Sequence, residues 1–547
     1  MNKKTFLSTS IFATISAIVF IISMFLNQDY FESLAYDSIF SYQFRQLGAI
    51  LLLFILGLLF LCIIRSTLSA GWAVLFAFPV GICLWVFISM LLLLIGIPYI
   101  FSLPILFIAG LLICLFFCRR HKASEHRLFK DFKEMTPFLM LFFGFALLSS
   151  SGFVYSFVSY DSYFYFTNYG HTLSIIKNFK DIVGENSFTL TNISQFLPIV
   201  NAYTSFWRLD QAFQVQTFFI YNVITAFFYG LYQFTSLTHP VFSDESTHLK
   251  YKKRALLFCI LFTLLLVSST SFIIVSSWAL ANMYSMVYIF FLFVATFLVS
   301  HLQTAQKESM LLISFFFIAL TLLRKDGIIF VAFFLICFCS IALFSKEQLA
   351  ILFLPAALTE VWWLYYVRVV LSPDVSQAVY SSIANNKNIF FVACILIGSF
   401  LYLFIIHGIL HWIETKIPFI TEYLLAYIGF SILLAYSYSV KRDIIIDNFD
   451  FVIRNMFKFP SSWGISALFF CIILVFSLID KFKLDYLHFL WSGYAFLNLV
   501  SYCIVDNKSF WVNWDDSYNR VLLQIVPVFV FIMAVKILPL LLPKVNS

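Results

Sequence analysis

Charged residues that border long apolar runs are the side chains of this sequence that could do chemistry. Asp161 directly follows one such run, within the stretch Ser159–Tyr160–Asp161–Ser162–Tyr163. A carboxylate at the edge of a membrane stays open to water while it borders a low-dielectric phase, so it could accept a proton from a hydroxyl group as a general base. Asp is also a preferred helix N-cap, and capping of a following surface helix is the competing interpretation.

Cationic side chains occupy similar boundaries. A short turn between two apolar runs reads Arg324–Lys325–Asp326–Gly327, and Arg520 directly precedes the final apolar run. The guanidinium fork suits phosphate oxygens, a lysine adds a point charge, and glycine permits close approach of the backbone. These residues predict a phosphate site, although ordinary anchoring at a membrane interface would also place cations there.

Further acidic residues could support such a site. Asp515 and Asp516 could bind a divalent cation such as Mg²⁺ or Mn²⁺ with phosphate as the remaining ligand, so a metal requirement stays open. Glu360 lies inside an apolar run, where an ionisable group costs several kcal/mol unless it faces protein or a wet cavity. Arg368 follows about two helical turns later. The two are interpreted either as supporting residues or as a structural buried pair.

The composition determines which solvent surrounds these residues. Of 547 residues, 62% are hydrophobic and 11% are charged, against roughly 25% charged in soluble domains. A soluble chain could not bury that much apolar surface, so we expect a lipid bilayer around it. The net charge of +7 falls in short loops and does not indicate a nucleic-acid partner. The bias towards Phe, Ile, Leu and Tyr indicates a bacterial source.

The apolar runs predict an all-α fold, a polytopic bundle of transmembrane helices. We expect about 16 spans, in a range of roughly 13 to 16. Their approximate limits are 5–26, 47–64, 73–95, 99–118, 135–158, 212–237, 255–276, 280–301, 309–323, 328–344, 349–371, 389–410, 419–440, 464–479, 487–505 and 521–541.

The distribution of Lys and Arg predicts the orientation of the bundle. The loops 119–133 and 250–254 are rich in basic residues, which is typical of cytoplasmic loops. With this orientation the chain is a multi-pass plasma-membrane protein with both termini in the cytoplasm. The segments then expected on the outer face are 160–211, 324–327, 441–463 and 506–520.

The longest outer segment, 160–211, has the pattern of an amphipathic first outer loop. Tyr163, Phe166, Leu173, Ile176 and Lys180 recur at about helical spacing, which predicts a helix lying on the outer leaflet and continuing to Lys180. A second apolar stretch over 196–207 could form another such helix.

Several motifs resemble the GT-C superfamily of membrane glycosyltransferases, which includes protein O-mannosyltransferases and bacterial aminoarabinose transferases. Asp161 matches the acidic residue of that superfamily's first long outer loop. In the stretch 276–284, Asn282 stands where an acid often stands. The stretch 322–327 is similar to a Leu-x-Arg-x-Glu/Asp-Gly segment, and 516–527 is similar to an Arg-Tyr-Leu-x-x-x-x-Pro ending. The first loop lacks the common adjacent acidic pair, and Asn282 cannot ionise.

The resemblance covers roughly 135–541 and implies a domain organisation and an activity. It implies an N-terminal four-helix accessory region (1–134), a catalytic transmembrane module (135–371) and a C-terminal transmembrane region (372–547). A sugar would pass, with inversion, from a polyprenyl-phosphate-linked donor to a cell-envelope acceptor on the outer face, in cell wall biogenesis. Asp161 would act as the base, and Arg324, Lys325 and Arg520 would bind the donor phosphate. The supporting residues would be Asn282, Asp326, Glu360, Arg368, Asp515 and Asp516.

Two alternatives remain open at this point. An O-antigen-type polysaccharide polymerase or ligase also uses lipid-linked sugars and outer-loop arginines. A lipid-linked sugar flippase or transporter predicts intramembrane charges along a central cavity and two related halves. The sequence shows no internal repeat, and its candidate charges gather on the predicted outer side.

Overall fold

The structure is entirely helical throughout the part that it describes. The computed structural model describes residues 3–26, 39–63, 68–98, 125–151, 169–182, 195–207, 213–237, 245–268, 281–302, 306–324, 327–340, 345–370, 386–416, 422–457 and 523–541, with isolated positions in 101–112, at 272 and in 493–497. Within these ranges every regular element is a helix and none is a strand. The predicted fold class is confirmed at this level.

The helices follow the apolar runs in chain order. In the first half they are α1 (Lys3–Leu26), α3 (Ile39–Ile63), α4 (Ala70–Leu94), α6 (Glu125–Ser150), α7 (Tyr169–Ile175), η4 (Phe179–Asp181), α9 (Phe196–Phe206), α10 (Phe213–Leu237) and α11 (Glu245–Ser268). In the second half they are α13 (Ala281–Leu302), α14 (Gln306–Leu323), α15 (Gly327–Ser340), α16 (Lys346–Tyr365), η5 (Tyr366–Val370), α18 (Asn386–Leu401), η7 (Tyr402–Ile406), α19 (His407–Lys416), α20 (Glu422–Val440), α21 (Arg442–Phe457), η8 (Leu523–Ile525) and α26 (Val526–Leu541).

Four of the described helical segments are long and apolar enough to cross a membrane. They are Tyr42–Leu61, Ala70–Leu94, Glu347–Val370 and Asn386–Ile413. Shorter apolar helices accompany them, among them Met283–Val299 in α13. Length and composition thus support a helical membrane protein, while the number of spans stays a prediction.

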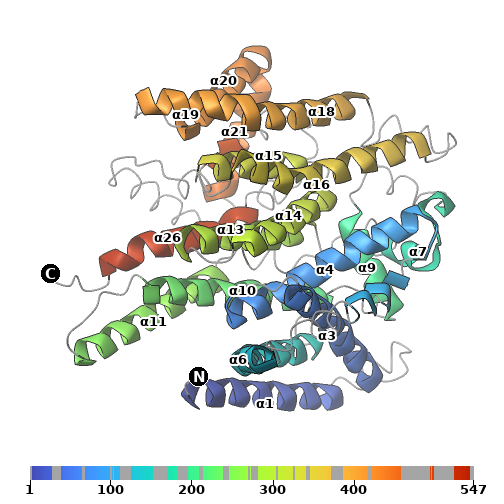
Figure 1. Ribbon diagram of the computed structural model, residues 1–547, viewed down its shortest axis with the longest axis vertical. Coiled ribbons are helices and arrows are strands. Elements are labelled where there is room, and N and C mark those ends of the chain that lie inside the picture. The colour runs from blue at the N-terminus through green and yellow to red at the C-terminus, as the bar shows by residue number, and fades with distance from the viewer. Residues whose placement is uncertain are drawn as a thin grey trace.

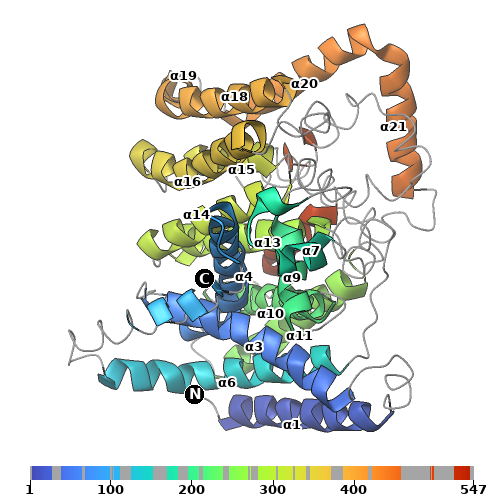
Figure 2. The same cartoon turned by 90° about the vertical axis from the view of Figure 1, so that its right-hand side faces the viewer.

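The helices form a stack whose two ends differ. The start of α1 and the end of α26 lie at one end, on the left in Figure 1, and α7 and α9 lie at the other. In Figure 2, which faces this second end, α7 and α9 lie in front of α13. Ring contacts join them, since Phe196 of α9 packs on Tyr284 and Tyr288 of α13. The described parts of the outer segment 160–211, residues 169–182 and 195–207, therefore lie at one end of the bundle.

Helices α3 and α4 cross where both carry glycine. A Cβ atom on Gly57 would lie 2.7 Å from the backbone nitrogen of Gly81, and one on Gly81 would lie 2.9 Å from the carbonyl carbon of Leu53. Small residues let helix backbones approach closely in a membrane, where packing rather than the hydrophobic effect holds helices together. The crossing therefore depends on glycine at both positions.

Polar side chains join α1 to α3 and α6. Ser10 Oγ donates to Met140 Sδ at 3.3 Å, and Gln43 Nε2 donates to Ser23 Oγ at 2.9 Å and to the Ser151 carbonyl oxygen at 3.2 Å. Such interhelical hydrogen bonds satisfy polar groups that lipid cannot. The range 1–134 is thus packed against the start of the range 135–371, and the predicted division into three regions stays a prediction.

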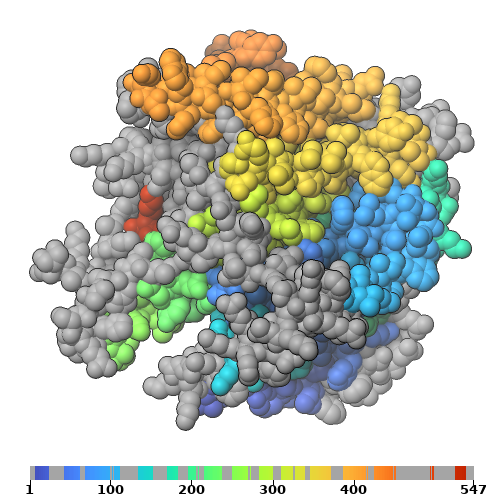
Figure 3. Space-filling view, viewed as in Figure 1, coloured from blue at the N-terminus to red at the C-terminus, as the bar shows by residue number. Residues whose placement is uncertain are grey.

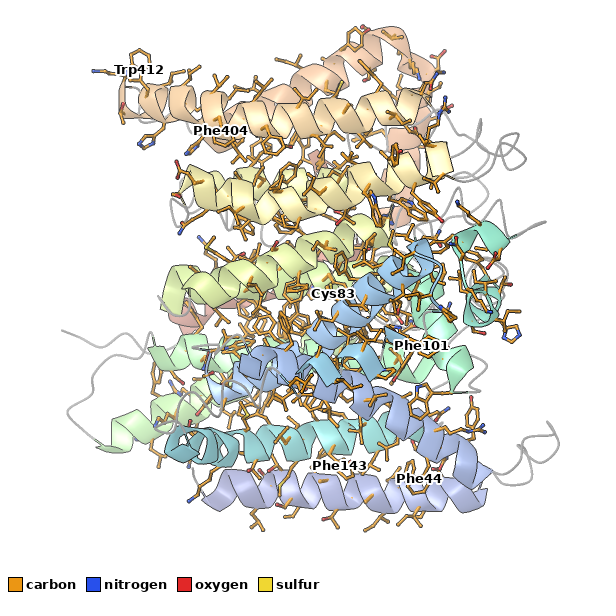
Figure 4. The ribbon with its side chains drawn as sticks, turned by 45° about the vertical axis from the view of Figure 1, so that its right-hand side comes forward. Phe44, Cys83, Phe101, Phe143, Phe404 and Trp412 are labelled. Carbon is orange, nitrogen blue, oxygen red and sulfur yellow. The ribbon has the colours of Figure 1, made fainter. Side chains whose placement is uncertain are left out.

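The outward faces of the stack carry many large apolar side chains. Figure 4 shows Phe404 and Trp412 pointing away from η7 and α19, whereas Cys83 of α4 lies in the middle of the stack. The exposed fraction is 64% for Trp412 and 1% for Cys83. Many large apolar side chains face outward, which indicates that the surrounding medium is lipid.

Two helices extend beyond the predicted spans. Helix α6 begins at Glu125 and α11 at Glu245, so each includes charged residues that were predicted to lie in cytoplasmic loops. The physical reason is that a helix satisfies its own backbone groups and can continue past the lipid boundary into water. Hydropathy marks where the lipid ends rather than where the helix ends.

Candidate functional site

Three of the predicted site residues have described side chains: Arg324, Glu360 and Arg368. Asn282 lies at the start of α13, and its side chain is outside the described part. The other predicted site residues also lie outside the described residues, namely Asp161, Lys325, Asp326, Asp515, Asp516 and Arg520.

Helix α16 has one lipid-type face and one buried face. Leu358, Val361 and Tyr365 are exposed along the first face, and Glu360 and Trp363 are buried along the second. In Figure 3 the yellow atoms of α15 and α16 lie beneath the orange atoms of α18 and α19, and α16 packs against α14, α15 and α18. Glu360 therefore faces protein rather than lipid, which is the placement that its sequence position predicted.

Glu360 and Arg368 are not paired. Glu360 is 4% exposed, and in the described part of the chain no hydrogen bond or ion pair reaches it. Arg368 is exposed in η5, and its Nη2 donates to Asn386 Oδ1 of α18 at 3.1 Å. The suggested buried pair is thus absent, because Glu360 lies on the buried face of α16 whereas Arg368 is exposed in η5.

The outer segment 169–182 is clasped to the end of α16. The hydroxyl of Tyr366 donates to Asn178 Oδ1 at 3.2 Å. Phe179 is fully buried, and its ring packs against Trp363 and Tyr366 at centroid distances of 5.6 and 6.1 Å. We call these four residues, Asn178, Phe179, Trp363 and Tyr366, the outer clasp.

A capping box gives the clasp its local shape. Asn178 Oδ1 accepts from the backbone nitrogen of Lys180 at 2.9 Å, and Asp181 Oδ2 accepts from the backbone nitrogen of Asn178 at 3.0 Å. This arrangement begins the short helix η4. The amphipathic helix predicted to continue to Lys180 instead ends at Ile175, because the Asn178 side chain takes over the backbone groups that a longer helix would use.

The same segment is fixed to α9 on its other side. Tyr169 is fully buried, and its hydroxyl donates to Gln195 Oε1 at 2.8 Å. Burial raises the pKa of Tyr169 well above its ordinary value, with Tyr366 as a smaller cause. Tyr169 therefore remains a neutral donor at any physiological pH. The apolar stretch predicted over 196–207 forms helix α9, but its side chains from 196 to 204 are buried, so its predicted place on the outer leaflet is not confirmed.

The turn between α14 and α15 is tight, as Gly327 predicted. The backbone nitrogen of Gly327 donates to the Arg324 carbonyl oxygen at 2.9 Å. A Cβ atom at Gly327 would lie 2.7 Å from the carbonyl carbon of Leu320. The guanidinium carbon of Arg324, which is half-buried, lies 6.0 Å from the centroid of the Phe330 ring. The cation is thus held beside an aromatic face at the end of two packed helices.

A polar contact joins this turn to the segment that follows Arg520. Phe330 stacks on Tyr494 with ring centroids 5.5 Å apart, and the Tyr494 hydroxyl donates to Gln524 Oε1 at 3.0 Å. Gln524 lies in η8, four residues after Arg520 in the chain. Tyr494 and Gln524 were not among the predicted site residues. Their signal in the sequence is a polar side chain within an apolar run, which must find a partner.

The Tyr366 hydroxyl is expected to contribute modestly to stability. Removing it in Tyr366→Phe takes away one hydrogen bond, so the free energy of unfolding should fall by about 0.5–1.5 kcal/mol. Asn178→Ala should cost more, because the cap of η4 is lost as well. Tyr365→Phe on the exposed face of the same helix is the control. Thermal unfolding in detergent would measure all three; equal melting of Tyr366→Phe and the wild type would argue against the clasp.

No protein-family model, curated protein or solved structure matches this chain. The class is therefore defined by the fold alone, an all-helical protein with helices suited to a lipid bilayer. Among the described residues, no group of His, Cys, Asp and Glu is arranged to hold a metal ion.

Proposed function

We propose that this protein is a membrane glycosyltransferase that moves a sugar from a polyprenyl-phosphate-linked donor to a cell-envelope acceptor on the outer face. The observation that carries the proposal is the path Arg324–Phe330–Tyr494–Gln524. It links the first cationic turn, through two aromatic rings, to the segment that follows Arg520, although nearly two hundred residues separate them in the chain. Two arginines that met at a membrane boundary would suit a lipid phosphate.

The proposed chemistry is a single displacement. An acceptor hydroxyl oxygen bonds to the anomeric carbon of the donor sugar, and the bond from that carbon to the phosphate oxygen breaks. Asp161 takes the hydroxyl proton. Arg324, Lys325 and Arg520 stabilise the negative charge of the departing polyprenyl phosphate. Inversion at the anomeric carbon follows from the single step.

The remaining predicted residues have secondary parts in this scheme. Asn282 begins α13, which packs against η8, so its helix borders the same region. Asp326 would orient the cationic turn. Asp515 and Asp516 would bind a divalent cation if the reaction uses one. Arg368, exposed beside Asn386, would contact phosphate groups of the surrounding lipid.

Replacing Arg324 provides the direct test of the proposed function. In Arg324→Gln, transfer of radiolabelled sugar from a lipid-linked donor by the purified protein should fall about 10²- to 10³-fold, the usual loss for one transition-state donor. Arg324→Lys should recover part of the lost transfer activity. The matched control is Arg442→Gln, because Arg442 also lies over an aromatic ring, Tyr438, at 5.9 Å. Equal transfer by Arg324→Gln and wild type would overturn the proposed role of Arg324, and a wild type that transfers no sugar would overturn the function.

A second candidate function has one observation in its favour. A buried carboxyl group within a membrane span, as at Glu360, is the feature that a flippase or transporter of lipid-linked sugars predicts. Proteoliposomes discriminate the two. Movement of the intact lipid-linked sugar between leaflets without cleavage favours transport, and appearance of a glycosylated acceptor favours transfer. A repeating polymer as the product would assign the protein to the polymerase alternative.

A further inference from the structure

The buried carboxyl group of Glu360 is left without a partner in the described structure. It is 4% exposed, on the face of α16 that packs against other helices. No described side chain donates a hydrogen bond to it, and Arg368 binds Asn386 instead. A buried polar group without a partner costs free energy, and more when it is ionisable. A buried acid within a membrane span is a candidate ligand-binding residue.

The register of two neighbouring helices places Arg324 at the depth of Glu360. Helices α14 and α16 pack together and both run towards the α7 end (Figure 1). Ser314 Oγ of α14 donates to the Leu352 carbonyl oxygen of α16 at 3.4 Å, which fixes the register. From there Glu360 is about 12 Å further along α16, and Arg324 is about 15 Å further along α14, at 1.5 Å per residue. The two side chains therefore start within about one helical turn of each other in depth.

The acid and the cation do not neutralise each other. The Arg324 guanidinium lies over the Phe330 ring of α15, and Glu360 lies on the stripe of α16 that also carries Leu352 and Ala356. These two positions are suited to two parts of one ligand. A phosphate group matches a guanidinium, and hydroxyl groups match a carboxyl group, which accepts hydrogen bonds. Trp363, one turn further out on the same face, adds an aromatic ring beside that position.

We propose that Glu360 binds the sugar hydroxyls of the lipid-linked donor whose phosphate lies on Arg324. This inference rests on the proposed function and names the part of the site that recognises the sugar. Glu360 is then a specificity-determining residue, distinct from the proposed base Asp161. The acid binds the ring and the guanidinium binds the leaving group.

The test compares binding of a lipid phosphate with and without its sugar. Affinities for farnesyl phosphate and for farnesyl phosphates of glucose, mannose and galactose are measured on the purified full-length protein in detergent. In Glu360→Gln the affinity for the best-bound farnesyl-phosphate hexose should fall about tenfold, the effect of one hydrogen bond to a charged group. The affinity for farnesyl phosphate should not change. Arg324→Gln should weaken both ligands.

Glu347→Gln is the matched control, because Glu347 is an exposed glutamate in the first turn of the same helix. It should leave both affinities unchanged. If Glu360→Gln does not fold, the same two affinities are compared in Glu360→Asp, which keeps the acid but shortens the side chain. Unchanged hexose binding in the Glu360 variants, or an equal loss for both ligands, would overturn the inference and leave the function standing. A wild type that binds none of the four ligands would overturn both.

Discussion

Replacing Asp161 with Asn is expected to lower the rate of sugar transfer about 10²- to 10⁴-fold, the usual contribution of a positioned general base. Asparagine keeps the size of the side chain and its carbonyl oxygen, but its amide cannot take a proton from the acceptor hydroxyl at neutral pH. Binding of the donor should be unaffected, because the phosphate contacts are assigned to arginine and lysine. Transfer assays and donor-binding measurements on the same purified variant would separate the two effects.

Asp443→Asn is the control for this substitution. Asp443 is an exposed acid in the first turn of α21, on the segment also predicted to lie outside the membrane. Its replacement should leave the transfer rate as in the wild type. Full transfer by Asp161→Asn, at normal membrane expression, would remove Asp161 from the mechanism and favour its interpretation as a helix cap.

Replacing Gly81 with Leu is expected to prevent α3 and α4 from packing. Even a Cβ atom at this position would lie 2.9 Å from the carbonyl carbon of Leu53 and 3.1 Å from the backbone nitrogen of Gly57. Backbone atoms cannot move aside as a flexible side chain can. The free energy of unfolding should therefore fall by about 3 kcal/mol or more, at or beyond the usual range for overpacking. Size-exclusion chromatography after heating in detergent would show the loss of the monodisperse folded protein.

Gly398→Leu is the matched control, since it introduces the same side chain into α18. Nothing lies within 4 Å of a Cβ atom at Gly398, and the residue faces outward, where a leucine meets lipid. This variant should melt like the wild type or slightly above it, because glycine lowers helix stability. If Gly81→Leu and Gly398→Leu melted alike, the close crossing of α3 and α4 would be wrong.

The sequence predicted the described helices well because hydropathy is a local property. An apolar run of sufficient length must form a helix in lipid, whatever its neighbours are, since each backbone group has to be satisfied within the segment. The same local argument predicted the tight turn at Gly327 and the burial of Glu360. It failed at Lys180, where the side chain of Asn178 competes with the helix.

The convergence of side chains from distant segments could not be predicted in the same way. One interpretation of the sequence was that Glu360 and Arg368 form a buried pair, because about two turns of one helix separate them. In the structure Arg368 binds Asn386 of α18, and Glu360 faces the interior. Which face of a helix contacts which neighbour depends on the rotation of that helix about its axis and on the order in which the helices pack. The residue spacing within one segment determines neither of these.

Hydropathy and charge therefore establish a helical protein built for a lipid bilayer, with its chemistry-bearing residues at the boundaries of the apolar runs. Only the packed structure shows that Phe330 and Tyr494 link the turn at Arg324 to Gln524, and that the outer segment at Asn178 contacts Tyr366. The physical reason is that helix formation in lipid is satisfied within one segment, whereas a site requires side chains from several segments to approach within a few ångströms.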